Sequence, residues 1–233
     1  MIVSINQPAY LPWLGYFHRI AVSDVHVVLD HVQFEKNSFT NRNKIRTKEG
    51  STWLTVPLRT KGQFGDLAIN KIETANDTPW PRKHFQTMKM NYARSPHFAG
   101  HQAFFEEMYN RPWTKLNELL DYSGAYLLES LGIKTRMIKS SELDVTGTKE
   151  DLVLEICRKV GATTYLSGPL GRNYIIDENF TAAGLKIAYQ DYKHPEYPQA
   201  FPGFEPYMSV IDLLFNCGPD SLPVILENQE TCI

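Results

Sequence analysis

Two short apolar runs, separated by an amphipathic stretch, constrain the fold of this 233-residue chain more than any other feature. The first run, residues 2–6, stops at Pro8, and the second, residues 25–30, ends on a carboxylate. Between them, apolar side chains recur at helical spacing over residues 13–22. Because strands that are buried on both faces read as unbroken apolar runs, the order strand, helix, strand predicts a parallel βαβ unit.

The same alternation returns after Gly132. Strands are predicted at 134–139, 164–167 and 186–190, with helices at 148–160, before Gly184 and at 210–217. We therefore predict an α/β fold with an open, mostly parallel sheet.

The middle of the chain has a different pattern. Residues 75–131 carry apolar side chains at helical spacing and predict a helical insertion within a single domain that covers residues 1–233. A further strand at 52–57 is expected to pair with 67–72 across a turn at Gly62–Gly65.

Charge narrows the class of protein. Lys and Arg number 24 against 26 Asp and Glu, which gives a formal net charge of −2, and 42% of the residues are hydrophobic. This balance excludes a disordered chain and argues against a duplex-DNA binder, which needs a broad basic surface.

The amino terminus and the cysteines bear on localisation. Residues 1–8 lack a basic region and a signal-peptide core, and no apolar run reaches the roughly 18–20 residues that cross a bilayer. The three cysteines form no CxxC pair, which suits a reducing compartment. We therefore expect a cytoplasmic protein with no membrane partner.

Parallel α/β sheets bind their ligands beyond the carboxyl ends of strands, and three segments are predicted to lie there. In the first, prolines and a glycine stiffen a turn that is crowded with aromatic residues. Such a turn suits a nucleotide base or a sugar, while a hydrophobic plug is an equal alternative for the aromatic residues. The candidate binding residues are Gln7, Tyr10, Trp13 and His18.

The second segment follows the predicted strand at 164–167. Glycines there let the backbone approach a ligand, and Arg172 would add a bidentate contact to a phosphate or carboxylate. The alternative is an ordinary turn with a surface arginine, since the spacing matches neither a P-loop nor GxGxxG. The candidates are Ser167, Gly168, Arg172 and Tyr174.

The third segment follows the predicted strand at 186–190. His194 is a candidate general base because the usual pKa of histidine lies near neutral pH, although a surface histidine is the alternative. Gln199 and Asn216 are candidates for orienting polar groups of a substrate. Cys217 is expected to be structural, because a helix carboxyl end raises the pKa of a thiol.

A basic run at 36–48 is the last candidate region. Its Asn41, Lys44 and Arg46 would contact an anionic substrate or RNA, whereas a solvated loop is the commoner meaning of such a run. The seven histidines show no HxH, HExxH or Cys-His grouping, so no metal site is predicted.

Together these segments resemble one known family. The resemblance rests on Gln-Pro-x-Tyr-Leu-Pro-Trp-x-Gly-Tyr-Phe at 7–17 and on the motifs at 165–168, 171–174, 194–199 and 209–216. The chain resembles the WbqC-like family over nearly its whole length. That resemblance implies a transferase that places glycine or another amino acid on the nitrogen of an amino sugar, in surface-polysaccharide (O-antigen) or secondary-metabolite biosynthesis.

The order of elements is also similar to nucleotidylyl transferases and pantothenate synthetases, which have a Rossmann-like sheet and activate a carboxylate with ATP before an amine receives it. ATP is therefore a candidate cofactor, with Mg²⁺ where ATP is used. The chain departs from these enzymes because it lacks a His-x-Gly-His motif, and the analogy is one of fold alone.

The leading hypothesis is an N-acyl or aminoacyl transferase that forms an amide on the amine of a nucleotide-linked amino sugar. Arg172, Lys44 and Arg46 would hold phosphates, and His194 would take the amine proton with Asp30 assisting. The acyl donor would be an adenylate made in place, a thioester on a carrier protein or an aminoacyl-tRNA. Polar groups of the substrate would be oriented by Gln7, Asn41, Gln199 and Asn216.

Two alternatives stay open at this point. A noncatalytic nucleotide-sugar-binding or scaffold subunit would bind its ligand without turnover, and an RNA-associated protein would use the basic run. The leading hypothesis depends on the expectation that Gln7, Arg172 and His194 line a common pocket.

Overall fold

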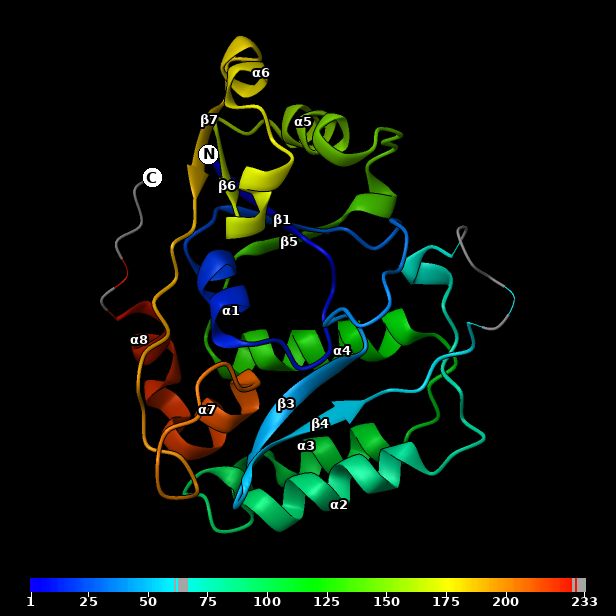
Figure 1. Ribbon diagram of the computed structural model, residues 1–233, viewed down its shortest axis with the longest axis vertical. Helices are drawn as coiled ribbons and strands as arrows, with labels where there is room; N and C mark the ends of the chain where they lie inside the picture. Colours follow the sequence, from blue (N-terminus) through cyan, green and yellow to red (C-terminus); the bar gives the residue numbers. More distant parts are fainter. Residues whose placement is uncertain (61, 63–66, 228, 230–233) are drawn as a thin grey trace.

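Five parallel strands form the central sheet of the protein (Figure 1). In the computed structural model, which describes residues 1–60, 62, 67–227 and 229, their order is β5-β2-β1-β6-β7. Every neighbouring pair runs parallel, so the predicted open, parallel α/β sheet is confirmed. The strands are β1 (Ile2–Asn6), β2 (Val25–Val28), β5 (Arg136–Lys139), β6 (Thr164–Ser167) and β7 (Lys186–Tyr189).

The direction in which strands are added reverses between β1 and β6. From β1 the chain adds β2 and then β5 on one side, and it returns to the other side of β1 with β6 before it adds β7. Ser4 of β1 pairs with Leu166 of β6, so the carboxyl ends of these two strands are neighbours. Open α/β sheets bind ligands in the crevice beyond such a reversal.

Helices cover both faces of the sheet. α5 (Lys149–Val160) packs its buried residues Leu152 and Ile156 into one hydrophobic core with Val3 and Val25 of the sheet. α1 (Leu14–Ala21) lies on the opposite side of the sheet, and α6 (Asp177–Ala182) flanks β7 (Figure 1).

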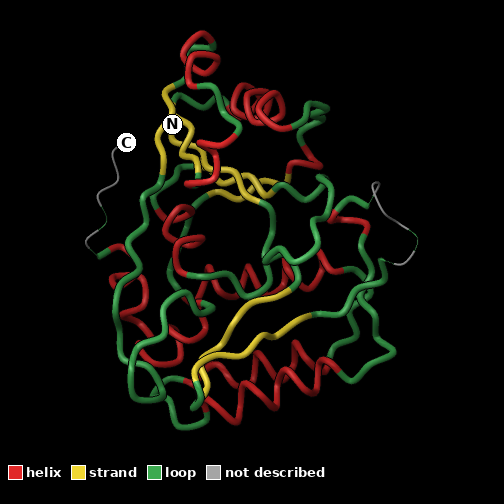
Figure 2. The backbone as a smooth tube through the Cα atoms, viewed as in Figure 1, coloured by secondary structure: helices red, strands yellow, loops and turns green. Residues whose placement is uncertain are grey.

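The long connection between β2 and β5 builds a second layer. In Figure 2 its antiparallel hairpin lies among helices, away from the central sheet. The carboxyl-terminal helices join this layer in one hydrophobic core. The predicted helical segment 75–131 corresponds to three helices of this connection. The elements of the layer are β3 (Arg42–Thr47), β4 (Gly50–Thr55), η1 (Ile69–Lys71), α2 (Trp80–Tyr92), α3 (Phe98–Asn110), α4 (Leu116–Ser130), α7 (Val210–Cys217), η4 (Gly218–Asp220) and α8 (Ser221–Leu226).

The predicted pairing of 52–57 with 67–72 is wrong. β4 pairs with β3 instead, with Asn43 opposite Leu54, and residues 69–71 form a single 3-10 turn. Adjacent strands close a short loop at low entropic cost, and Asn43 and Leu54 are both buried on the inner face. Of the predicted Gly62–Gly65 turn, all but Gly62 lies outside the described residues.

Three buried histidines are expected to make stability depend on pH. Burial lowers the pKa of His18 to about 4, of His26 to about 3 and of His84 to about 4, from the usual 6.5. Between pH 6.5 and about 4 the unfolded chain therefore binds protons that the folded chain does not. As the pH is lowered through this window, the free energy of unfolding should fall by up to roughly 1.4 kcal/mol per pH unit for each histidine.

Urea unfolding above and below pH 6.5 measures this slope. A His18→Gln variant should show a shallower pH dependence of stability than the wild type, because one of the groups whose pKa is lowered in the folded chain is removed. Equal slopes in this variant and in the wild type would contradict the assignment of His18.

Candidate functional site

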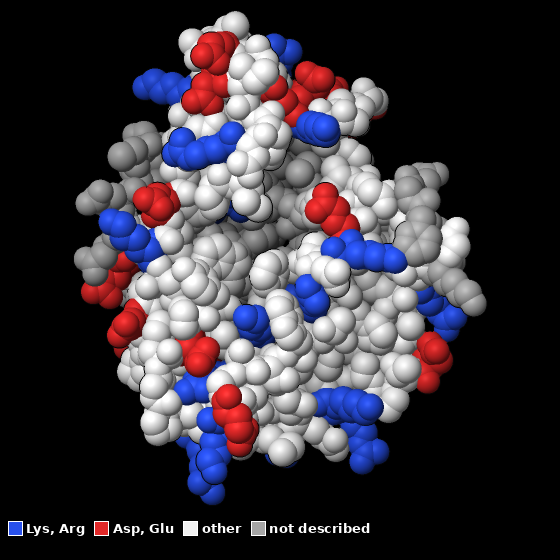
Figure 3. Space-filling model, viewed as in Figure 1, with Lys and Arg blue, Asp and Glu red and all other residues white. Residues whose placement is uncertain are grey.

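A pocket of about 490 Å³ opens where β1 and β6 end, at the reversal of strand order. The space-filling view shows this face of the molecule hollowed near its centre (Figure 3). A cavity of this size suits a nucleoside or a sugar. The pocket is lined by Ile5, Asn6, Trp13, Arg19, Phe39, Tyr165, Ser167, Gly168, Pro169, Leu170, Gly171, Tyr174 and Tyr207.

Arg19 is the one charged side chain among the described residues that line this pocket. Only 8% of the residue is exposed, and its Nε is buried without a hydrogen-bond partner. Within the described part of the chain, no carboxylate lies at ion-pair distance from its guanidinium. Burial lowers the pKa of this group. A buried charge without a counter-ion is unfavourable, so the position of this guanidinium suits the binding of an anion.

Gly168 gives the Arg19 guanidinium its space. A Cβ at this position would overlap the Nη1 of Arg19, and φ of Gly168 is −74°, so the glycine serves close approach rather than an unusual backbone angle. Gly168 therefore approaches Arg19 closely, and it also lines the pocket where a ligand was predicted.

Gly168→Ala is expected to displace the guanidinium and weaken the binding of inorganic pyrophosphate about tenfold, because a charge-assisted hydrogen bond depends on its geometry. Isothermal titration calorimetry gives the affinity. Gly100→Ala is the matched control, because a Cβ at Gly100 meets no atom within 4 Å. Equal affinities in both variants would contradict this role of Gly168.

Aromatic rings form one wall of the pocket. Trp13 precedes α1, and its ring centroid lies 5.9 Å from that of Tyr207. Tyr174, which comes from the loop after β6, is 44% exposed and lines the same space. Exposed ring faces next to a cation provide stacking for a base or sugar and charge for a phosphate.

His194 lies behind this wall instead of in the pocket. Its ring stacks on that of Trp13, with centroids 6.5 Å apart and 16° between the planes. Its Nδ1 donates to the carbonyl of Pro195 at 2.9 Å, and its Nε2 is buried without a partner. Burial lowers the pKa of His194 below its usual value. The ring does not line the pocket and packs against Trp13, and its role as a general base stays a prediction.

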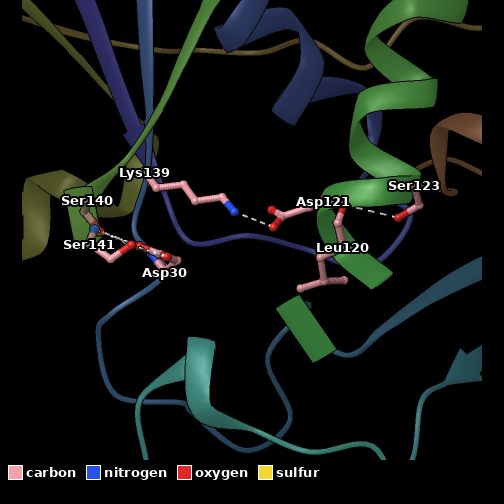
Figure 4. Close-up of polar contacts among 7 residues, drawn as sticks. All are labelled: Asp30, Leu120, Asp121, Ser123, Lys139, Ser140 and Ser141. Atoms are coloured by element: carbon pink, nitrogen blue, oxygen red, sulfur yellow. Dashed lines mark hydrogen bonds and ion pairs between the residues drawn. The ribbon is translucent and has the colours of Figure 1, made fainter. Parts of the chain in front are cut away.

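Asp30 joins the segments after two strands of the sheet through its carboxylate. It is buried, and its carboxylate accepts hydrogen bonds from the Ser140 hydroxyl at 3.0 Å and from the backbone and hydroxyl of Ser141 at 2.9 Å and 2.6 Å (Figure 4). These bonds tie the end of β2 to η2 (Ser140–Glu142), the short turn that follows β5. The predicted catalytic role of Asp30 stays a prediction, and its carboxylate does not line the pocket at the strand reversal.

Tyr10 and His18 also belong to the interior. Tyr10 is fully buried, and its hydroxyl is hydrogen-bonded to Nδ1 of His84 at 3.0 Å and to the hydroxyl of Tyr109. His18 is 2% exposed, and its Nδ1 accepts from Gln190 at 2.8 Å. Neither side chain lines the pocket, so for Tyr10 the alternative of a hydrophobic plug is correct.

The guanidinium of Arg46 donates hydrogen bonds to backbone carbonyls. It is buried and donates to the carbonyls of Thr47 at 2.6 Å, Gly50 at 2.8 Å and Pro202 at 2.7 Å. The side chain therefore fastens the hairpin to the carboxyl-terminal loop and has little capacity left for a phosphate or for RNA.

Gln199 and Asn216 both bind Asp212, the centre of a buried network. Asp212 accepts from Tyr92 at 2.7 Å, from Tyr197 at 2.9 Å and from Gln199 at 2.8 Å. Asn216 donates to the Asp212 carbonyl at 2.7 Å. Burial raises the pKa of the Asp212 carboxyl. These polar groups orient parts of the protein rather than a substrate.

Arg172 and Gln7 are sequence neighbours of residues that line the pocket, but they do not line it themselves. Arg172 is exposed, and its guanidinium carbon lies 4.0 Å above the ring of Tyr189. The expectation that Gln7, Arg172 and His194 converge is therefore not met by these residues. The same three segments nevertheless meet through Trp13, Tyr174 and Tyr207.

Lys44 lies on β3 of the hairpin, and Asn41 directly precedes that strand. Asn41 donates to the Val56 carbonyl at 2.8 Å, and the Lys44 ammonium lies 5.3 Å from the ring centroid of Trp53. Neither side chain lines the pocket at the end of β1 and β6.

Four of the predicted residues line the pocket: Trp13, Ser167, Gly168 and Tyr174. The most important omission is Arg19. In the sequence it lies outside the apolar spacing of Trp13, Phe17 and Ile20, and its burial on α1 is seen only in the tertiary structure.

The donor set of the pocket fits a phosphate but does not fit an ATP–Mg²⁺ pair. Arg19 provides the cation for a phosphate, while no described residue lining the pocket is a carboxylate that would bind Mg²⁺. In the described part of the chain, no three His, Cys, Asp or Glu side chains come together as ligands for a metal ion. No helix of that same part is long and apolar enough to cross a membrane.

The open parallel sheet places this protein in the α/β class of folds. The sequence profile of the WbqC-like protein family matches residues 7–224, and the chain belongs to that family. It is 34% identical over 221 residues to a Mycobacterium tuberculosis protein named as uncharacterized, covering 94% of this chain and 95% of that protein. No solved structure matches the chain.

Proposed function

We propose that this protein is an N-acyl or aminoacyl transferase that forms an amide on the amine of a nucleotide-linked amino sugar. The observation that carries the proposal is the buried Arg19 guanidinium without a counter-ion, next to exposed aromatic rings at the strand reversal. A nucleotide diphosphate supplies both the negative charge and the flat ring that such a pocket accepts.

In this proposal the side chains that line the pocket bind the nucleotide sugar and orient its amine toward the acyl donor. Arg19 holds the phosphates, and Trp13 and Tyr207 flank the base or sugar. The amine nitrogen attacks the carbonyl carbon of a thioester or aminoacyl ester, the C–N bond replaces the C–S or C–O bond, and the proton of the amine leaves with the thiol or hydroxyl product. Holding both reactants in place supplies much of the rate acceleration.

A direct assay tests this proposal. The protein is incubated with UDP-glucosamine and either an aminoacyl thioester or aminoacyl-tRNA, and the amide product is measured by mass spectrometry. A parallel incubation with ATP, glycine and hydroxylamine tests the predicted use of ATP, because hydroxamate forms only where the protein activates the carboxylate itself. An amide that forms only with an activated donor supports transfer, and the absence of an amide with every donor contradicts it.

A noncatalytic nucleotide-sugar-binding subunit is the second candidate. It is favoured by one observation: the described residues that line the pocket include neither a carboxylate nor an imidazole, the usual proton acceptors. This candidate predicts that UDP-glucosamine binds with an affinity that depends on Arg19 and that no turnover occurs with any donor.

A further inference from the structure

A second cavity, of about 270 Å³, lies between α1, α4 and the carboxyl ends of β2 and β5. The end of β1 and the segment that follows it line both cavities: Asn6 and Trp13 belong to the first, and Pro8 and Pro12 belong to the second. Tyr16 also lines the second cavity, and the pKa of its buried hydroxyl responds to Arg19 of the first pocket and to Asp121 of the second. The two cavities are therefore neighbours.

The second cavity is apolar except for three charged side chains, Lys139, Asp121 and Glu142. Lys139 Nζ and Asp121 Oδ2 are 2.6 Å apart, and their side chains are 37% and 39% exposed. Figure 4 shows them reaching toward each other from the end of β5 and from α4. The body of the cavity is lined by side chains such as Phe17, Ile20 and Leu128. One ammonium group and two carboxylates thus lie beside an apolar space.

Gly124 shows that packing alone does not explain this space. It lies inside α4 and lines the cavity, and a Cβ built there would meet no atom within 4 Å. Glycine destabilises a helix interior relative to alanine, so a position with open space would ordinarily favour a larger residue. A larger side chain at this position would extend into open space beside the cavity lining.

We propose that the second cavity binds an amino acid with an apolar side chain. The side chain enters the apolar space, the α-ammonium group meets Asp121, and the carboxyl end meets Lys139. Two opposite charges side by side match the ammonium and carboxylate groups of one amino acid, each through a charge-assisted hydrogen bond. That this amino acid is the donor of the acyl group rests on the proposed function, whereas its binding does not.

Cavity size selects the class of amino acid. An apolar protein cavity of roughly 150 Å³ holds benzene, so the larger space here accommodates a side chain of the size of leucine or phenylalanine. Glycine would leave the apolar part empty and bind more weakly, since buried apolar area contributes to affinity.

Binding of free ligands to the full chain tests the proposal. L-Leucine is titrated by calorimetry and compared with 4-methylpentanoate, which lacks the ammonium group, with 3-methylbutylamine, which lacks the carboxylate, and with glycine. Leucine is expected to bind at least about tenfold more tightly than each of the three, because each lacks one of the recognised groups. Failure of leucine and phenylalanine to bind at millimolar concentration would overturn the proposal.

Gly124→Leu places a side chain in the cavity, and Gly100→Leu is the matched control in α3, where a Cβ also meets no atom within 4 Å. Both changes remove a glycine from a helix and favour folding. Leucine binding should fall at least about tenfold in the first variant and stay unchanged in the second. Equal binding in both variants would place the ligand elsewhere and overturn the proposal.

The two proposals fail separately. UDP binding is measured in the same samples, and it depends on Arg19 of the first pocket. UDP binding without leucine binding removes the amino acid site and leaves the proposed function standing. Leucine binding that Gly124→Leu abolishes, without UDP binding, upholds the amino acid site and removes the nucleotide-sugar substrate.

Discussion

Replacing Arg19 by methionine is expected to lower the affinity for UDP at least about 100-fold, while the melting temperature stays the same or rises. Affinity falls because the variant removes the one charged group among the described residues that line the pocket. Stability is retained because methionine keeps the apolar stem and removes a buried charge that has no counter-ion in the described structure. If Arg19 mattered for folding alone, the substitution would lower the melting temperature and leave the affinity for UDP unchanged.

Arg172→Met is the matched control for this prediction. Arg172 follows the same β6 strand but is exposed and stacks on Tyr189, so its loss should change the affinity for UDP less than about threefold. Arg19→Lys should give an intermediate affinity, because lysine keeps the charge without the planar fork of the guanidinium. The assignment would be contradicted by wild-type affinity in Arg19→Met, or by a larger loss in Arg172→Met.

Asp212→Ala is expected to lower the free energy of unfolding by about 3–5 kcal/mol, which is a large share of the stability of an ordinary domain. The change leaves the buried hydroxyls of Tyr92 and Tyr197 and the amide of Gln199 without their acceptor. Each unsatisfied buried donor is unfavourable by about 1–3 kcal/mol. Urea unfolding monitored by tryptophan fluorescence measures the loss.

Two further variants separate the network from general effects of charge. Asp212→Asn keeps one acceptor oxygen and should lose only about half as much stability. Asp220→Ala removes an exposed carboxylate close by in sequence and should change stability by less than about 0.5 kcal/mol. A loss in Asp212→Ala below about 1 kcal/mol would show that the network adds little to folding.

The strands and helices of this protein follow from local patterns in the sequence. The strand predicted at 164–167 is β6 residue for residue, and the helix predicted at 148–160 differs from α5 by a single position. Apolar periodicity suffices here because burial of one face or of both faces dictates the pattern. The pairing of β4 was mispredicted because it depends on which neighbour closes the shorter loop, and 42–47 is too rich in charge to read as a strand.

The sequence by itself determined the parallel α/β class and the three strand-end segments that meet at the pocket. Only the tertiary structure decided which side chains of those segments face the ligand space. Arg19 and Arg172 carry the same guanidinium, yet one is buried at the strand reversal without a counter-ion and the other is exposed over a tyrosine ring. Burial and pairing are properties of the surroundings that distant segments create, so local sequence cannot distinguish these two arginines.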